Sequence, residues 1–237
     1  MQLSANEKSY QGIRQKLETG KLGPGDKLIT RTLAQEFGVS LSPVREAIHR
    51  LATEGLVNHT PGAGAEVKSL SLDDLNDLYV LRDAIESCAA GLAAEIVTSD
   101  DLEELEFIIS GQADLAKELE KSNQTSSKKN GSASKTQMAR WVALEEQFHA
   151  AVMRCARNRL LAKVVRDQRT IGRIFQSHLH HGDLLTAETA RVTVEGKREL
   201  LEVFRSRDSE RARAIVSQQI RRGRAHVIGL LRAKGIR

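Results

Sequence analysis

The stretch TLAQEFGVSLSPVREAIHRLATEGL, residues 32–56, decides the fold of the first part of this chain. Its apolar residues repeat at helical spacing on both sides of a short interruption at Gly38-Val39-Ser40-Leu41. The spacing predicts one helix over about 30–37, ended by Gly38, and a second helix that Gly55 ends. Ser42 is a good N-cap and Pro43 suits the first helical position, so we expect the second helix to begin there.

Another helix precedes this pair, and two short strands follow it. Residues 4–7 have the pattern of a capping box that opens a helix, and Gly20 ends that helix. Residues 56–59 and 65–67 have the pattern of short strands, with a turn between them. Three helices followed by a two-stranded hairpin are the layout of a winged helix-turn-helix domain.

The helix expected after Ser42 carries polar residues on its outward face. Arg45 and His49 are four residues apart and therefore share one side of the helix with Ser42 close by. An arginine in that place can bind guanine O6 and N7 with two hydrogen bonds, or bind a phosphate. The alternative is a small helical domain in which Arg45 pairs with Glu46 or is solvated.

From residue 71 onward the chain shows long helical periods and no proline, since all three prolines lie in the first 61 residues. The polar, low-complexity residues 121–136 predict a flexible loop. We expect a boundary near 68–72, with domains at 1–70 and 71–237. The second domain is predicted to be all-helical, with helices at about 71–96, 99–119, 137–156, 159–181, 187–206 and 208–234.

Composition narrows the class of protein. Hydrophobic residues make up 40% of the 237 residues, which is enough for a core, and the two cysteines make a disulfide framework implausible. The first ten residues lack an apolar stretch, and no apolar run approaches 18 residues, so we expect no signal peptide, no membrane span and a cytoplasmic protein. Aromatic content of 3% argues against a surface that stacks single-stranded bases.

Charge is unevenly distributed along the chain. Lys and Arg number 9 against 7 Asp and Glu in residues 1–70, 2 against 14 in residues 71–120, and 25 against 10 in residues 121–237. Acidic and basic helices that pack together explain this pattern most simply. A basic stripe for nucleic acid is the alternative.

The first domain resembles the DNA-binding domain of the GntR family of bacterial transcription regulators. The resemblance covers Leu22–Val67 and is carried by Pro24-Gly25-Asp26, Arg31, Leu33-Ala34, Phe37-Gly38-Val39-Ser40, Pro43-Val44-Arg45-Glu46-Ala47, Leu51, Glu54-Gly55-Leu56-Val57, Pro61 and Gly64.

The resemblance implies that the protein contacts double-stranded DNA through particular residues. The family's contact positions fall on Arg31, Ser40, Ser42, Arg45 and the hairpin, to which Gly64 belongs. Two positions depart from the family pattern, because Leu41 and Ala63 stand where arginine or lysine is common. Direct readout of bases is therefore expected to be thinner or differently targeted.

The second domain resembles the effector domain of FadR-type regulators, called FCD. This resemblance implies an antiparallel helical bundle around a ligand cavity. It is carried by Asp74, Leu78-Tyr79-Val80-Leu81-Arg82, Ile85-Glu86, Ala89-Ala90, Glu145, Phe148-His149, Arg157-Asn158, Leu200-Leu201, Val203-Phe204, Asp208 and Ala212.

The FCD resemblance also raises the question of a metal. Many such domains hold a divalent ion with an aspartate, a histidine four residues later and two further histidines. Glu145 and His149 match the first pair here, but Lys197 and Gln219 stand at the other two positions. Because an ammonium group repels a cation, we expect that the metal site is lost and that no cofactor is bound.

Lys197 and Arg82 point instead to an anionic effector. Arg82 interrupts an apolar stripe, so its guanidinium needs either Glu86 or a ligand carboxylate as a partner. Lys197 either faces Glu145 inside the bundle or lies on a solvated face. We expect a small carboxylate effector at a site formed by Arg82, Glu145, His149, Lys197 and Gln219.

The sequence thus predicts a ligand-responsive repressor that binds operator DNA as a homodimer. An enzyme built on Glu145, Glu146 and His149 is one alternative, but it lacks a nucleophile with a base and an orienting group. A protein–protein adaptor that has lost DNA binding is another, because of Leu41 and Ala63. We therefore expect no catalytic residues.

Overall fold

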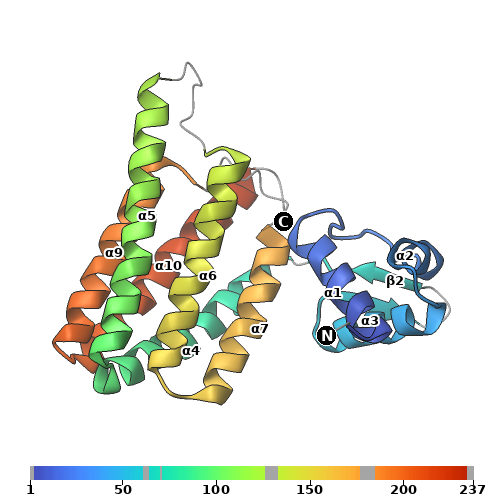
Figure 1. Cartoon of the computed structure of the whole chain (residues 1–237), viewed down its shortest axis with the longest axis horizontal. Coiled ribbons are helices and arrows are strands. Elements are labelled where there is room, and N and C mark those ends of the chain that lie inside the picture. Colours follow the sequence, from blue (N-terminus) through green and yellow to red (C-terminus); the bar gives the residue numbers. More distant parts are fainter. Residues whose placement is uncertain (1–2, 61–63, 70, 126–132, 177–184, 234–237) are drawn as a thin grey trace. The chain divides into compact units, whose positions relative to one another are not determined.

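The computed structural model describes residues 3–60, 64–69, 71–125, 133–176 and 185–233 (Figure 1). The chain divides into two compact units, one of residues 1–75 together with 167–178, the other of residues 76–166 and 179–237. The order of the described elements is that of a winged helix-turn-helix followed by a helical bundle, so the predicted fold class is confirmed.

The first unit contains, among its described residues before Leu75, a three-helix layer and a two-stranded antiparallel sheet. The strands pair from Val57 opposite Val67 to Thr60 opposite Gly64. The tip of the wing, residues 61–63 with Ala63, lies outside the described residues. The elements are α1 (Ala5–Glu18), α2 (Thr30–Phe37), α3 (Leu41–Thr53), β1 (Val57–Thr60) and β2 (Gly64–Val67).

The start of α3 differs from the prediction. Ser40 is the N-cap and the helix begins at Leu41, so Ser42 is not the cap and Pro43 occupies the third helical position rather than the first. The first amides of a helix have no partner within it, so a proline there costs no hydrogen bond. Gly38 ends α2 in the left-handed conformation (φ 63°), as expected.

A third backbone segment supports the wing, and the sequence pattern did not reveal it. Lys27 forms an isolated antiparallel bridge with Glu66, and the Leu28 amide donates a hydrogen bond of 2.8 Å to the Ala65 carbonyl. The Val67 amide likewise donates to the Asp26 carbonyl at 2.9 Å. The segment before α2 therefore covers one edge of β2 and fixes the wing to the helices.

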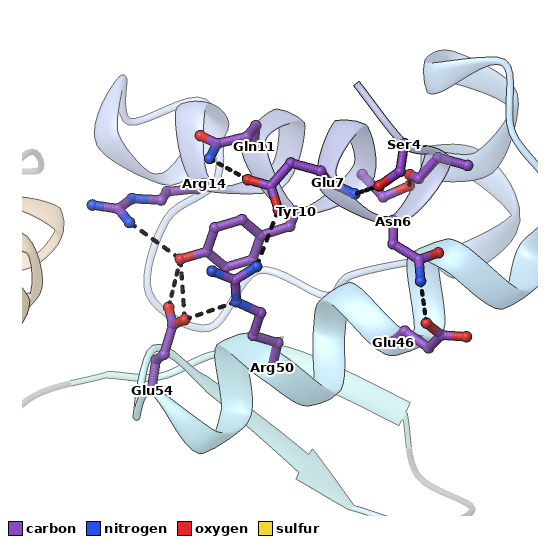
Figure 2. Close-up of polar contacts among 11 residues, drawn as sticks. Ser4, Asn6, Glu7, Tyr10, Gln11, Arg14, Glu46, Arg50 and Glu54 are labelled. Atoms are coloured by element: carbon purple, nitrogen blue, oxygen red, sulfur yellow. Dashed lines mark hydrogen bonds and ion pairs between the residues drawn. The ribbon is translucent and has the colours of Figure 1, made fainter. Parts of the chain in front are cut away.

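A polar cluster joins α1 to the end of α3, as Figure 2 shows. The Tyr10 hydroxyl donates to the Glu54 carboxylate at 2.9 Å, and it accepts a hydrogen bond of 3.1 Å from Arg14. The Arg50 guanidinium lies over the Tyr10 ring, 3.6 Å from its centroid, and pairs with Glu54 and Glu7. Burial raises the pKa of Tyr10, and Glu54 adds to that effect against the opposing Arg14, so the phenol keeps its proton.

The second unit is built from long helices. In it α5 packs against both α6 and α9, and α10 packs on α9 (Figure 1). Its core includes the fully buried side chains of Leu105, Leu115, Leu119, Leu200 and Phe204. The later helices of the chain are α4 (Leu72–Ile96), α5 (Ser99–Thr125), α6 (Lys135–Cys155), α7 (Arg159–Gln176), α9 (Ala187–Arg205) and α10 (Ser209–Ala233).

Two predicted features in this part need correction or fall outside the description. The loop expected at 121–136 was placed too wide, because α5 continues to Thr125 and α6 starts at Lys135; residues 126–132 lie outside the described residues. Ile96, the apolar residue at the end of the helix predicted at 71–96, is 44% exposed, and α4 ends at this residue. The histidines at 178, 180 and 181 also lie outside the described residues.

Neither cysteine forms a disulfide. Cys88 and Cys155 are both free, and burial raises the pKa of the Cys155 thiol to about 12. At neutral pH that thiol therefore stays protonated and is a poor nucleophile. None of the described helices is both long and apolar enough to cross a membrane.

The hydroxyl of Tyr10 gives a first testable prediction. The Tyr10→Phe variant removes one buried hydrogen-bonding group between α1 and α3, and we expect it to lower the free energy of unfolding by about 1 kcal/mol. The matched control is Glu36→Gln, which breaks the Lys16–Glu36 pair, whose glutamate side chain is 47% exposed; it should change stability by less than about 0.5 kcal/mol. Urea unfolding monitored by circular dichroism makes the comparison. Equal losses in the two variants would contradict the structural role of Tyr10.

Candidate nucleic-acid interface and buried charge cluster

The packing of α3 decides which of its side chains can meet a ligand. One face of the helix is buried in the core of the first unit. The opposite face carries Ser42, Arg45 and His49, which are all exposed, as is Ser40 at the N-cap. The buried face consists of Pro43, Val44, Ala47, Ile48 and Leu51.

The guanidinium groups of Arg45 and Arg31 are available for a partner outside the chain. Among the described residues neither group has an ion pair or a hydrogen bond, and both side chains are exposed. The alternative partner of Arg45, Glu46, instead accepts a hydrogen bond from Asn6 of α1 (Figure 2). It also accepts a long hydrogen bond, 3.5 Å, from Ser42. The predicted alternative of an Arg45–Glu46 pair is therefore absent from this described surface.

The first turn of α3 adds uncapped amides to this surface. The Ser40 side chain makes no capping hydrogen bond in the described structure. Amides at a helix N-terminus carry partial positive charge and suit a phosphate group. Leu41, one of the departures from the family pattern, is 40% exposed beside them.

A histidine that the sequence interpretation missed joins the same surface. The imidazole of His59 on β1 lies against that of His49 on α3, with ring centroids 4.5 Å apart. Gly64, predicted as a contact, is exposed at the start of β2 with a φ of 98°, a conformation that favours glycine. Alternation in a strand of only four residues gave no signal that His59 would face α3.

A second polar site lies inside the helical bundle, where four helices contribute charged or amide side chains. On α4, the Arg82 Nε donates a hydrogen bond of 2.7 Å to the Glu86 carboxylate, and Glu86 is only 2% exposed. On α6, His149 lies between two carboxylates. Its Nδ1 is 3.7 Å from Glu86 Oε2, and its Nε2 is 3.4 Å from Glu145 Oε2.

Lys197 of α9 completes this cluster. Its Nζ lies 2.5 Å from Glu145 Oε1 and 3.0 Å from Gln112 Oε1 of α5, and 4.3 Å from the centroid of the Phe148 ring. Lys197 is 3% exposed, so the alternative that it lies on a solvated face is wrong. The Gln112 amide in turn donates to Glu145 at 2.6 Å.

The structure brings most of the predicted effector residues together. Arg82, Glu145, His149 and Lys197 belong to one chain of contacts, which we call the buried charge cluster together with Glu86 and Gln112. Gln219 of α10 donates its hydrogen bond, 3.0 Å, to the carbonyl of Gly196, the residue before Lys197. It therefore supports the backbone beside Lys197, and no contact of Gln219 with Glu145 or His149 is seen in the described structure.

Gln112 was missed, although the sequence held a signal for it. It stands in the apolar stripe of α5, between Leu105 and Ile109 on one side and Ala116 and Leu119 on the other. A glutamine in such a stripe is buried, and a buried amide needs partners. Its full burial and its two hydrogen bonds agree with that rule.

Electrostatics fix the ionisation of the cluster. Burial alone would raise the pKa of the Glu145 carboxyl, but the Lys197 ammonium and His149 outweigh burial and hold that pKa well below its usual range. Glu145 therefore stabilises the fold at every pH above the unfolded-state pKa of about 4.3. That contribution is lost only as the pH falls through the depressed folded-state pKa.

The donor set does not fit a divalent metal. The ammonium of Lys197 occupies the Glu145 oxygen at which a metal would be expected, and it is a cation rather than a ligand. No group of three or more His, Cys, Asp or Glu side chains suited to a metal occurs in the part of the chain that the structure describes. The cluster is chemically a set of ion pairs.

Protein-family models match both parts of the chain. The family model described as bacterial regulatory proteins of the gntR family matches residues 6–67, and the FCD domain model matches residues 77–222. The first is a model of regulatory proteins, and similar proteins are named as transcriptional regulators, in agreement with the prediction that the chain is not an enzyme.

Curated relatives are similar over part of their length. The HTH-type transcriptional regulator McbR of Escherichia coli K12 is 34% identical over 97 residues, 41% of this chain and 44% of McbR. The uncharacterized HTH-type transcriptional regulator YdhC of Bacillus subtilis 168 is 30% identical over 156 residues, 66% of this chain and 62% of YdhC. The HTH-type transcriptional repressor RspR of E. coli K12 is 32% identical over 101 residues, 43% of this chain and 44% of RspR. The matches thus span less than two thirds of each of these relatives.

Solved structures share the fold along nearly the whole chain. The structure of E. coli McbR/YncC superposes with a TM-score of 0.71 at 21% identity and covers 98% of this chain and 100% of that one. A putative transcriptional regulator GntR from Rhodococcus sp. RHA1 gives a TM-score of 0.70 at 18% identity, with 96% and 99% covered. At these identities the likeness concerns the fold alone.

The Lys197–Glu145 pair gives a second prediction. The Lys197→Met variant leaves Glu145, whose side chain is 21% exposed, without its cation, and we expect it to lower the free energy of unfolding by about 3 kcal/mol, the lower end of the range for a buried pair. The double variant Lys197→Met/Glu145→Gln should recover much of that loss, because the uncompensated charge is gone. Arg191→Gln, on an exposed side chain of the same helix, is the control and should change stability by less than about 0.5 kcal/mol. Urea unfolding curves test this, and a double variant no more stable than Lys197→Met would refute the pairing argument.

Proposed function

Because the chain belongs to the GntR family of bacterial regulatory proteins and carries an FCD domain, we propose that it is a ligand-responsive transcription regulator. In this proposal residues 1–70 bind operator DNA, and residues 71–237 bind a small effector and form the dimer. The observation that carries it is the exposed face of α3, where Arg45 has no ion-pair partner among the described residues while the opposite face is buried.

The geometry of α3 suggests how DNA is bound. A helix held across its predecessor by a short turn can lie in the major groove, with its N-terminal half toward the bases. In that position Arg45 can reach guanine O6 and N7, while Arg31, Ser40 and Ser42 can bind phosphate oxygens. His49 and the wing residue His59 extend the contact surface, and Gly64 lets the wing backbone approach the DNA closely.

We expect a homodimer on two half-sites because one DNA-binding domain of this size offers only a small contact area. One module of this size gives limited affinity, and two modules on a near-palindromic operator add their contributions. Operator DNA as the partner supports a location in the cytoplasm. Repression is supported by the similarity to RspR, whose name describes a repressor.

The adaptor alternative is less well supported. It rested on Leu41 and on Ala63, the latter outside the described residues. However, an adaptor that had lost DNA binding would not need Arg31 and Arg45 to be exposed cations beside uncapped helix amides. Both features are suited to phosphate and base contacts.

The buried charge cluster supports a carboxylate effector in the second domain. Arg82 and Lys197 are cations inside the bundle, and each holds an internal carboxylate, Glu86 or Glu145. A ligand carboxylate can take the place of one of these internal partners so that the cation stays paired, and the displaced glutamate then has to find another donor or take up a proton. His149, which contacts both glutamates, would donate a hydrogen bond to the ligand.

Exchange of partners would couple the effector to DNA. A ligand that takes Lys197 from Glu145 would break a contact between α9 and α6, whereas exchange at Arg82 leaves its partner Glu86 on the same helix, α4; in this proposal the coupling therefore runs through α6 and α9. The effect on DNA depends on the difference in effector affinity between DNA-competent and incompetent arrangements. A coupling free energy of about 1–3 kcal/mol, typical of allosteric proteins, is sufficient.

DNA binding is tested at Arg45. We expect Arg45→Ala to weaken binding to the operator by about 1–3 kcal/mol and to leave binding to a scrambled duplex nearly unchanged, because only base contacts are sequence-specific. Arg191→Ala, which removes the same charge from an exposed, ion-paired position, serves as control. Gel shifts with the promoter of the protein's own gene measure both. Unchanged operator affinity in Arg45→Ala would refute the proposed interface.

The effector class is tested by ligand-induced stabilisation. Small carboxylates and their uncharged amide analogues are compared as pairs by thermal shift. A carboxylate at about 100 times its Kd should stabilise the protein by about 2.7 kcal/mol, and its amide should not. Arg82→Met and Lys197→Met should lose the response relative to their own baselines, and Arg191→Gln should keep it. If no carboxylate stabilises the wild type, or if both Met variants respond equally well, the effector site lies elsewhere.

A further inference from the structure

The last residues of the sequence carry positive charge only. Residues 221–237 contain no acidic residue. Their cations are Arg221, Arg222, Arg224, Arg232, Lys234 and Arg237. The described part of this stretch is the last half of α10, which continues to Ala233.

Arginines earlier in the same domain have partners. Arg191 pairs with Glu188 and Glu195. Arg205 pairs with Glu202 and with Glu106 of α5. Similar pairs join Arg211 to Glu199 and Arg221 to Asp83. These arginines are therefore already neutralised within the chain, although the exposed Arg159 and Arg198 have no such pair among the described residues.

Arg222 and Arg232 lie on one helix and also have no such pair. Both side chains are exposed, and among the described residues neither has an ion pair or a hydrogen bond. They lie away from Ile220 and Val227, the residues that α10 buries. Arg232 in the last turn can offset the helix dipole, but Arg222 is three turns from the helix end, beyond the reach of that effect.

The chemistry of this face favours a regular polyanion over a protein. Arg222 and Arg232 are separated by ten residues, about 15 Å along the helix. The positions between them on the same face are His226 and Gly229, both exposed, so the face offers no large apolar side chain. Protein interfaces depend on apolar or aromatic anchors at their centre, whereas phosphate contacts need only cations and donors.

We infer that the exposed face of α10, with Arg222, His226 and Arg232, is a second contact surface for the phosphate backbone of duplex DNA. This inference rests on the proposed function, since it adds to a DNA-binding regulator a contact without sequence preference. The contact would increase affinity for any duplex long enough to reach it. Base specificity would stay with α3.

The experiment measures how salt affects DNA binding. Binding of the full chain to an operator duplex of about 60 base pairs is followed by fluorescence anisotropy from 50 to 300 mM KCl. Each phosphate contact contributes about 0.9 to the slope of log K against log salt concentration. We expect Arg222→Gln/Arg232→Gln to lower the magnitude of that slope by about 1 to 2.

The control variant is Arg191→Gln/Arg205→Gln. It makes the same change in net charge at two exposed arginines that are already paired. We expect its slope to match the wild type. Circular dichroism and melting curves establish that both double variants are folded, and an operator compared with a scrambled duplex shows that base discrimination is kept.

The outcomes separate the inference from the proposed function. If the wild type fails to bind any duplex, the proposed function fails. If the wild type binds and Arg222→Gln/Arg232→Gln keeps the wild-type slope, the α10 contact is refuted, and a role in binding an acidic protein would then be pursued. An equal fall in the slope of the control variant also refutes it, because net charge alone would explain the result.

Discussion

A buried charge needs a partner, and that constraint arranges both halves of this protein. In the bundle it draws Lys197 to Glu145 and Arg82 to Glu86, and thereby ties α9 to α6 and strengthens one turn of α4. In the first unit it has the opposite consequence. The buried face of α3 is purely apolar, so Arg45 lies on the exposed face, where its guanidinium can pair with a group of another molecule.

The two sites therefore differ in how they use charge. On α3 the cations are exposed and their counter-ions would come from DNA, so binding should be strongly dependent on salt. In the buried charge cluster the counter-ions are already present within the chain. A ligand bound there, as proposed, would compete with Glu86 or Glu145, so its affinity would reflect an exchange of partners and would be set by geometry more than by net attraction.

Much of the architecture could be predicted from periodicity and capping, and the misses have physical reasons. The bounds of α2 were predicted because an apolar stripe and Gly38 mark them. The start of α3 was misplaced because a proline is equally harmless at several positions of the first turn. Two contacts depend on tertiary packing, which a local sequence pattern does not report: the bridge between Lys27 and Glu66, and the contact between His59 and His49. At the buried charge cluster the charged members were predicted, but Gln112 was found only in the structure.

The contacts around Tyr10 have a consequence for how the protein would search a chromosome. Arg50 is held by the Tyr10 ring, Glu54 and Glu7, so the base of α3 is fixed before any encounter with DNA. If α3 is already rigid before it meets DNA, it loses little conformational entropy on docking and needs no folding step. Sampling of one site after another can then be fast, and the mobile part is confined to the side chains at the tip. In the proposed function, the fixed end of α3 near Arg50 would favour a fast search, and the exposed side chains at its other end would provide base discrimination.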